Sequence, residues 1–392
     1  MNRFSSRTSW QLHPNRLTML RAEKERRGEP VTDLTMSNPT LCGVQYPEEM
    51  LRPLASTDSL IYAPSPFGLP AARKAVSGYY QRKGITVDPE NVILCGSTSE
   101  AYGWLFMLMC NPGDEVLVPT PCYPLFEFIA QLHDVVLRPY RLAYDGQWHI
   151  DPDTMRTQIR PRTRAIILVS PHNPTGHCLS ADELNAIGAL AATADIALIV
   201  DEVFSEYRFA SQDRDITSTV DGTGALTFTL NGISKLCGLP QLKLGWIVVS
   251  GEAGRVGEAH RRLEIIADTF LPVNTPVQVA LQEILDSGSD IRAAITARIT
   301  VNLGTLDTVL SHETPVSRLR CDGGWTAILR LPSTRNDEAW ALLLLERSGV
   351  LVHPGYFFDM TDHPYVVVSL LADPEHFASA CRQIVALVAG ET

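Results

Sequence analysis

Residues 226–246 read LTFTLNGISKLCGLPQLKLGW, and this stretch decides the fold. Leu226–Leu230 is a short β-rich run, and Leu244–Val249 is a second run that begins a few residues later. Lys235 lies between them, just past the end of the first predicted strand. The chain has only five lysines among 392 residues, so chance is a poor explanation for this position. A lysine held in a partly desolvated site has a lowered pKa and can act as a nucleophilic amine.

Short apolar runs and longer helical patterns alternate on the N-terminal side of this stretch. The predicted strands are Val92–Cys95, Glu115–Val118, Ala165–Val169 and Ile196–Val200, and the predicted helices are Ser99–Cys110, Leu125–Leu132 and Ala181–Ala192. The last helix has Ser180 as its cap and Glu183 three residues later, the pattern of a capping box. Short, almost wholly apolar strands between helices predict a buried, mainly parallel sheet in an α/β fold.

The C-terminal part of the sequence has a different character. It contains a long predicted helix, two strands and two further helices, at Ile291–Leu310, Thr326–Leu331, Tyr365–Leu370, Asp337–Ser348 and from Pro374 onward. This pattern predicts a smaller α+β domain. We therefore expect three parts: an N-terminal segment at 1–48 that packs on the small domain, a large domain at 49–288 and a small domain at 289–392.

Composition excludes several classes of partner. The net charge of −11 argues against nucleic acid and acidic lipid surfaces. The start of the chain has no apolar leader, and its longest apolar stretch is interrupted by polar residues, so we expect no membrane span. Eight cysteines without a CxxC pair and ten histidines without HxH or HExxH predict free thiols in a reducing cytoplasm and no metal site.

Polar residues follow four of the predicted strands. Gly96-Ser97-Thr98-Ser99-Glu100 opens a helix, and small residues there form either a phosphate cradle or an ordinary cap. Asn173 stands in the turn Pro171-His172-Asn173-Pro174-Thr175-Gly176, and Asp201-Glu202 follows the strand at Ile196–Val200. Because ligands bind beyond the carboxyl ends of the strands in such sheets, we expect these groups to meet there with Lys235.

One cofactor matches this order of groups well. Pyridoxal phosphate needs a phosphate cup, a donor to its phenolic oxygen, a carboxylate for its ring nitrogen and a lysine that forms a Schiff base.

The sequence resembles the class I/II aminotransferases of fold type I from about Leu34 to the last helix. The resemblance rests on six motifs in order: Tyr62-x-Pro-x-x-x-Gly68, Gly96-Ser-Thr-Ser-Glu-Ala101, Pro121-x-Tyr123, Asn173-Pro-Thr-Gly176, Asp201-Glu202 and Ser234-Lys235-x-x-Gly238-Leu-Pro-x-Leu-Lys-Leu-Gly-Trp246. It implies a large domain with a mainly parallel seven-stranded sheet sandwiched by helices, plus a smaller α+β domain. It also implies a cytoplasmic homodimer that moves an amino group between an amino acid or amine and a 2-oxo acid.

The resemblance assigns roles to individual residues. Lys235 is the Schiff-base lysine and proton shuttle, and Asp201 keeps the ring nitrogen protonated. Asn173 binds the phenolic oxygen, and Tyr123 stacks on the ring. The phosphate is held by Ser97, Thr98, Ser99, Ser234 and Lys243, and by Tyr62 of the partner subunit. Trp325 and Tyr356 lie where the small domain faces the substrate, as pocket residues or as plain core.

Four positions depart from the family pattern. Lys243 replaces an arginine for the phosphate, Gly232 replaces a serine, Phe204 replaces a tyrosine, and Val367 replaces the arginine that clamps the substrate carboxylate. The last departure leaves three alternatives: another arginine serves, the carboxylate is bound differently, or the substrate lacks one. It also keeps open a lyase, cyclase or oxidase acting on an amino acid on the same scaffold.

Overall fold

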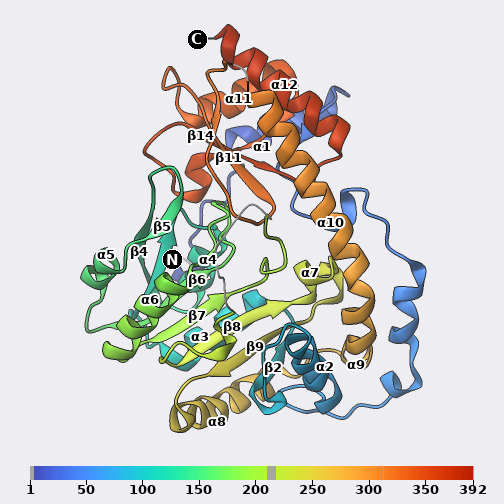
Figure 1. Ribbon diagram of the computed structural model, residues 1–392, viewed down its shortest axis with the longest axis vertical. Coiled ribbons are helices and arrows are strands. Elements are labelled where there is room, and N and C mark those ends of the chain that lie inside the picture. The colour runs from blue at the N-terminus through green and yellow to red at the C-terminus, as the bar shows by residue number, and fades with distance from the viewer. Residues whose placement is uncertain (1–3, 210–217, 312, 392) are drawn as a thin grey trace.

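The computed structural model describes residues 4–209, 218–311 and 313–391. Two β-sheets lie one above the other, and the long helix α10 (Leu281–Leu310) runs from the larger to the smaller (Figure 1). This helix begins ahead of its predicted start at Ile291. The predicted domain boundary at 288/289 falls inside it and stays a prediction.

The larger sheet has eight strands in the order β2-β9-β8-β7-β6-β3-β4-β5. Their bounds are β2 Val92–Cys95, β3 Glu115–Thr120, β4 Val136–Tyr144, β5 Trp148–Ile150, β6 Thr163–Val169, β7 Ala197–Asp201, β8 Thr227–Gly232 and β9 Gly245–Ser250. Strands β8, β7, β6, β3 and β4 are mutually parallel, whereas β9 runs antiparallel to both β2 and β8. The mainly parallel α/β sheet is confirmed. The sheet has eight strands instead of the expected seven because the short β5 pairs antiparallel with β4 and forms the edge.

Alternate side chains of these strands enter two different cores, which is why the runs are apolar on both faces. In β3, Val116 and Val118 pack with α3 (Thr98–Met109), whereas Leu117 packs with α6 (Ala181–Thr193) on the opposite face. The capping box of Ser180 and Glu183 is present at the start of α6.

The remaining helices complete the two layers. They are α1 Arg16–Arg26, α2 Pro70–Gln81, α4 Leu125–Leu132, α5 Pro152–Gln158, α7 Ile233–Leu236, α8 Ala253–Phe270, α9 Thr275–Val279, α11 Asp337–Ser348 and α12 Pro374–Gly390. The 3-10 turns are η1 Ser6–Thr8, η2 Pro39–Leu41, η3 Glu48–Ala55, η4 Thr57–Leu60, η5 Pro89–Asn91, η6 Thr219–Asp221, η7 Pro240–Leu242 and η8 Gly355–Phe358. No helix among the described residues is long and apolar enough to cross a bilayer.

The smaller sheet is antiparallel, in the order β10-β11-β14-β13. Its strands are β10 Ser317–Arg318, β11 Thr326–Arg330, β13 His353–Pro354 and β14 Tyr365–Ser369, and a separate parallel pair joins β1 (Thr32–Asp33) to β12 (Val350–Leu351). The two faces of β14 differ in their neighbours. Val366 and Val368 enter the core under α11 and α12, whereas Tyr365 and Val367 pack in the cluster that faces the larger sheet.

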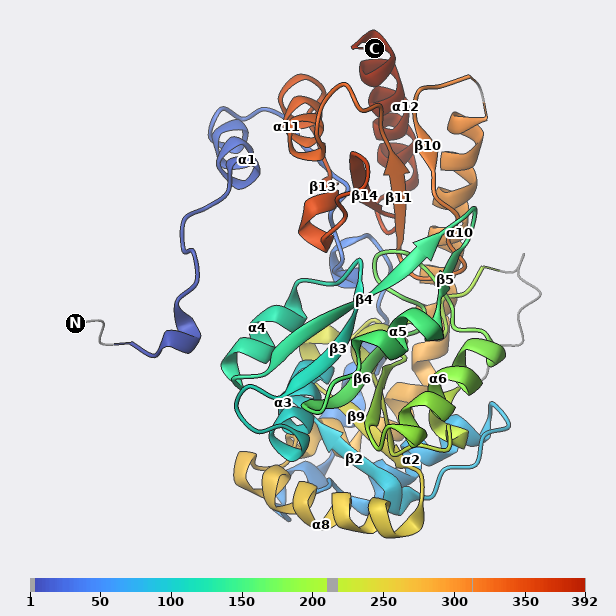
Figure 2. The same ribbon diagram turned by 90° about the vertical axis from the view of Figure 1, so that its left-hand side faces the viewer.

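The N-terminal segment contacts both halves of the molecule. Helix α1 packs on α11, and the extended residues before it cross to α4 (Figure 2). There Arg7 forms an ion pair with Asp134, and the Trp10 indole nitrogen donates to Gln131 over 2.5 Å.

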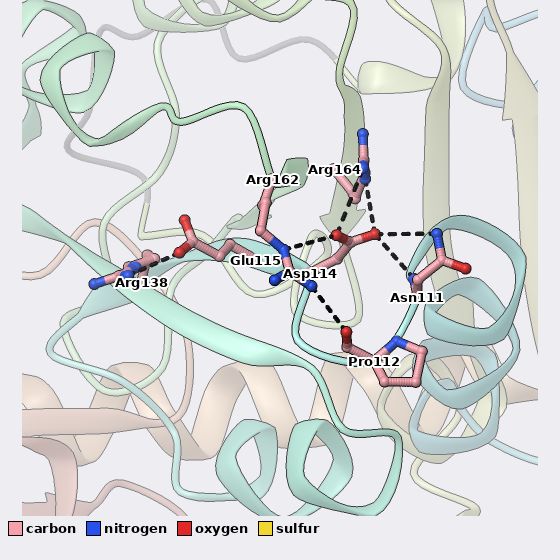
Figure 3. A network of polar contacts seen from close by, with 7 residues as sticks. All are labelled: Asn111, Pro112, Asp114, Glu115, Arg138, Arg162 and Arg164. Atoms are coloured by element: carbon pink, nitrogen blue, oxygen red, sulfur yellow. Dashed lines mark hydrogen bonds and ion pairs between the residues drawn. The ribbon is translucent and has the colours of Figure 1, made fainter.

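Two buried carboxylates form ion pairs with partly exposed arginines at the amino ends of β3, β4 and β6 (Figure 3). Asp114, whose side chain is 4% exposed, contacts Arg164 at 2.9 Å and Arg162 at 3.3 Å. Glu115 beside it pairs with Arg138 at 2.7 Å. These contacts connect β3 to its two neighbours, β4 and β6, at the amino ends of the three strands.

Candidate active site

A cavity of about 310 Å³ lies at the carboxyl ends of the central strands. All of the predicted cofactor residues line it except Tyr62. The lining also includes side chains that sequence reasoning did not select, namely Ser37, Tyr102, Leu125, Phe126, Val169 and Val203.

Asp201 ends strand β7 and points into this cavity from a buried position. Its Oδ2 accepts a hydrogen bond from the Tyr102 hydroxyl at 3.1 Å, and its Oδ1 accepts from the Val203 amide at 3.1 Å. Burial raises the pKa of Asp201 to about 6, although both hydrogen bonds oppose the shift. The carboxylate is therefore held in a fixed orientation in a place where its charge has little solvent to stabilise it.

Lys235 enters the same cavity from the short helix α7, which directly follows β8. Its ammonium nitrogen lies 4.9 Å from the centre of the Trp325 ring and 5.8 Å from that of Phe204. Burial lowers the pKa of Lys235 to about 8, while the charge of Asp201 acts in the opposite direction. The two groups thus share one site in which each is less readily charged than in water.

The N-terminus of α3 forms the opposite wall. Ser97 caps this 12-residue helix by accepting from the Glu100 amide at 3.2 Å, and Thr98 and Ser99 line the cavity beside it. A Cβ at Gly245 would lie 3.1 Å from the Asn231 carbonyl oxygen, a tight contact, and 3.4 Å from the backbone of Ser97 and Thr98, so β9 runs close to both β8 and the helix end. Unpaired backbone amides and the positive end of the helix dipole suit an anion here.

The remaining cradle residues come from loops. Ser234 and Lys243 line the cavity, and Lys243 has a left-handed backbone with φ of 54°. Tyr123 is 44% exposed at the mouth of the cavity. Asn173 lines the cavity with its Oδ1 buried and without a hydrogen-bond partner among the described residues. A buried amide oxygen in this condition leaves hydrogen-bonding capacity for a ligand.

Three of the four departures from the family pattern have local structural consequences. A Cβ at Gly232 would lie 2.9 Å from the Gly245 Cα, so a serine would collide with the backbone of β9. Phe204 lines the cavity, with its ring 5.3 Å from Trp325. Val367 is 1% exposed inside an apolar cluster and brings no charge to this face.

Other predicted residues lie elsewhere. Tyr62 is 70% exposed and does not line the cavity of its own chain. Tyr356 also lies outside the lining, with its ring against Phe357 at 4.8 Å. Trp325 is also outside the lining and belongs to a buried apolar cluster, with its ring 4.9 Å from the Lys235 ammonium nitrogen. Tyr207 donates its hydroxyl to the Lys235 carbonyl at 2.6 Å, so it supports the lysine's backbone rather than replacing the missing tyrosine.

Tyr102 and Ser37 are the two hydroxyl-bearing members of the six lining residues that sequence reasoning did not select. Tyr102 lies one helical turn after Thr98, a spacing that places both on one side of α3 and could have pointed to it. Ser37 belongs to the irregular N-terminal part, where no periodic signal exists.

Comparisons with known proteins find relatives of this chain. The family model described as "Aminotransferase class I and II" matches residues 41–384. The glutamate-pyruvate aminotransferase AlaA of Escherichia coli strain K12 is 31% identical over 277 residues, 69% of this chain and 67% of that protein. The arginine–pyruvate transaminase AruH of Pseudomonas aeruginosa is 28% identical, over 98% of this chain and 95% of that protein.

Solved structures resemble the whole fold. An aminotransferase from Escherichia coli superposes with a TM-score of 0.88 at 25% identity, covering 99% of this chain and 98% of that chain. An alanine aminotransferase from Pyrococcus furiosus, 23% identical over the full length of both chains, has the same fold with a TM-score of 0.89.

Proposed function

This chain belongs to the class I and II aminotransferases, and on that premise we propose that Lys235 and Asp201 carry its chemistry in the cavity described above. The protein is an enzyme that transfers an amino group between an amino acid and a 2-oxo acid, and its cofactor is pyridoxal phosphate. The observation that carries the residue assignment is the pairing of a buried carboxylate and a buried lysine, each with its charged form disfavoured, in one cavity.

The residues of the cavity fit this cofactor. The α3 N-terminus with Ser97, Thr98 and Ser99 would hold the phosphate, together with Ser234 and the cationic Lys243. Asn173, whose amide oxygen lacks a partner among the described residues, would turn its amide nitrogen to the phenolic oxygen. Tyr123 at the cavity mouth would cover one face of the ring.

Asp201 would hold a proton on the ring nitrogen. Its two oxygens are already oriented by Tyr102 and Val203, so little reorganisation is needed to accept a further N–H. A positive partner would also relieve the cost of burying this carboxylate. When bound, pyridoxal phosphate supplies an electron-withdrawing ring, which is effective only while that nitrogen stays protonated.

Lys235 would attach the cofactor covalently and later move the substrate proton with the same nitrogen. Its lowered pKa leaves a useful fraction of the amine neutral near pH 8, which a base requires. The rings of Trp325 and Phe204 pack around this nitrogen and would exclude water from it. With Phe204 in place of a tyrosine, the second donor to the phenolic oxygen is missing.

Pyruvate is the amino acceptor that we propose. The names of the two relatives compared above both specify pyruvate as a partner in the exchange. The donor is an amino acid, and the proposed half-reaction with pyruvate yields alanine.

We further propose a cytoplasmic homodimer. Tyr62, predicted to reach the partner's phosphate, is exposed and lies beside the exposed apolar side chains of Leu60 and Ile61. An apolar surface of this kind supports burial against a second copy. The described residues form no disulfide bond, which supports a reducing compartment.

The experiment that tests the function incubates the purified holoenzyme with amino acids and follows both products. Transfer requires one 2-oxo acid per aminated cofactor, and pyruvate must then restore the original absorbance and yield alanine. Release of ammonia, or consumption of dioxygen, without the aminated cofactor would instead identify a lyase or an oxidase.

A further inference from the structure

The face of the small sheet turned toward the large domain has no charge at Val367, where the family arginine is expected. Strands β13 and β14 are antiparallel there, and their register puts His353 directly opposite Val367. Side chains directly opposite each other in an antiparallel pair lie on the same face, with Cβ atoms about 4.5–5.5 Å apart. The imidazole of His353 therefore stands on the face that Val367 leaves apolar.

Two contacts of His353 connect it, through one or two residues, to side chains that line the cavity. Its ring lies 5.8 Å from that of Phe358, whose carbonyl accepts a hydrogen bond from the Cys122 amide at 3.0 Å. Cys122 directly precedes Tyr123 at the cavity mouth. The ring also hydrogen-bonds the backbone of Thr35, two residues before the cavity residue Ser37.

The ring has unused hydrogen-bonding capacity. Its Nδ1 is buried and has no hydrogen-bond partner among the described residues. A buried polar atom left in this state costs free energy that a ligand atom could recover. Burial lowers the pKa of His353, while the charge of Asp33 and a hydrogen bond to the Thr35 backbone oppose the shift. Because that bond uses the single N–H of the neutral ring, Nδ1 can donate to a ligand only in the protonated imidazole, a form that an anionic ligand favours.

One arginine shares this face of the sheet. Arg330 on β11 is opposite Tyr365, two positions along the strand from Val367. It is exposed, and its guanidinium lies 3.0 Å from the ring of His363, in the outer cleft that also contains the interdomain ion pair of Arg141 and Asp362. Arg330 is therefore the alternative candidate for binding a substrate carboxylate, and its substitution provides a matched control.

We propose that His353 recognises the carboxylate of the substrate from the strand next to Val367, in place of the missing arginine. This inference rests on the proposed function, since it names the group that selects the substrate of that same site. It also resolves the three alternatives left by the sequence in favour of a carboxylate that is bound differently. The imidazolium would hold it by a single charge-assisted hydrogen bond from Nδ1 rather than by a two-pronged ion pair.

The test measures binding separately from turnover. Titration calorimetry on the holoenzyme compares 2-methylalanine, which lacks the proton to be removed, with isopropylamine, the same molecule without its carboxylate. In His353→Phe the Kd of 2-methylalanine should rise about 10- to 100-fold, the usual value of a charge-assisted hydrogen bond. The Kd of isopropylamine should stay the same. In turnover, KM for carboxylate substrates should rise more than kcat falls.

Two further variants make the outcome decisive. His353→Gln keeps a donor and should retain part of the discrimination between the two ligands, and it replaces His353→Phe if that variant does not fold. Arg330→Met should leave both Kd values unchanged. If the His353 variants keep the Kd of 2-methylalanine within about twofold, or if Arg330→Met weakens it instead, the assignment is wrong. The proposed function fails separately, if the wild-type enzyme yields no 2-oxo acid from any amino acid.

Discussion

Gly232 illustrates how a single residue decides the shape of this site. The strand β8 must pass close to β9 so that Lys235 and the end of α3 face one cavity. A Cβ at 232 would lie 2.9 Å from the Gly245 Cα and 3.0 Å from the Leu244 carbonyl oxygen. Both contacts are with backbone, which cannot move aside as a flexible side chain could. The serine found here in the family therefore has no room in this chain.

Gly232→Ser should lower the free energy of unfolding by about 1–3 kcal/mol, because overpacking forces backbone shifts. Urea unfolding of the cofactor-free protein measures this. Gly304→Ser is the matched control, since nothing lies within 4 Å of a Cβ at that exposed helical position. Equal stability of the two variants would contradict the account of the strand approach.

Asp201→Asn should reduce turnover about 10²- to 10³-fold, the usual effect of removing a preorganised charge from a reacting site. The asparagine has nearly the same shape and can still accept from Tyr102 or Val203, so the melting temperature should change little. Steady-state kinetics at saturating cofactor, alongside thermal unfolding, separates the two effects. A rate within a few-fold of wild type would exclude Asp201 as the partner of the ring nitrogen.

At the scale of elements, the ion pairs of Asp114 and Glu115 hold β3, β4 and β6 together at their amino ends, whereas the cavity lies at the carboxyl ends of the strands. Hydrogen bonding by Arg164 is the largest influence on Asp114 and lowers its pKa to about 2. An aspartate with a depressed folded pKa contributes stability that is complete above its ordinary value near 3.8 and is lost as pH falls toward 2. The arginines therefore stabilise the fold at neutral pH and lose this effect in acid.

We predict that Asp114→Asn lowers the melting temperature at pH 7 and flattens the fall in stability between pH 4 and pH 2 relative to wild type. Asp153→Asn is the control, since that carboxylate pairs with Arg156 at an exposed site. Melting curves across this pH range provide the measurement. A wild-type slope retained in Asp114→Asn would show that other carboxylates dominate acid unfolding.

How far the elements could be predicted depended on their pattern. The strands of the large sheet were recognisable because each is a short apolar run bounded by polar residues, and β2 has its predicted bounds. Helix α8 was not predicted, since Gly254 and Gly257 near its start and the many charges after them obscure the apolar stripe. In the site, Lys235 follows β8 and Asp201 ends β7, so the sequence could predict that both lie near the carboxyl ends of the strands. The position of His353 opposite Val367 depends on a register that only the folded sheet provides.

At the scale of the whole molecule, the proposed dimer completes the site. If Tyr62 serves the partner's phosphate, two defective subunits can repair each other. A hybrid of a Tyr62→Ala subunit with a Lys235→Ala subunit has one site with both residues intact and one with neither.

We predict that mixing and reassociating these two variants at limiting cofactor restores activity above that of either alone. The two variants carry different affinity tags, so that the hybrid can be purified from the mixture. The measurement is the activity of the purified hybrid. Lys74→Ala, at an exposed position on α2, serves as the control subunit. If the hybrid is no more active than the Tyr62→Ala homodimer, Tyr62 acts within its own chain or not at all.

The central claim is that Lys235 bears the cofactor, and borohydride reduction tests it most directly. The holoenzyme is reduced and digested, and the modified lysine is located by mass spectrometry, with Lys235→Ala and Lys74→Ala treated in parallel. The account predicts a reduced pyridoxyl group on Lys235 in wild type and Lys74→Ala, and none in Lys235→Ala. A stoichiometric adduct on Lys243, or on any other lysine of the wild-type protein, would contradict it.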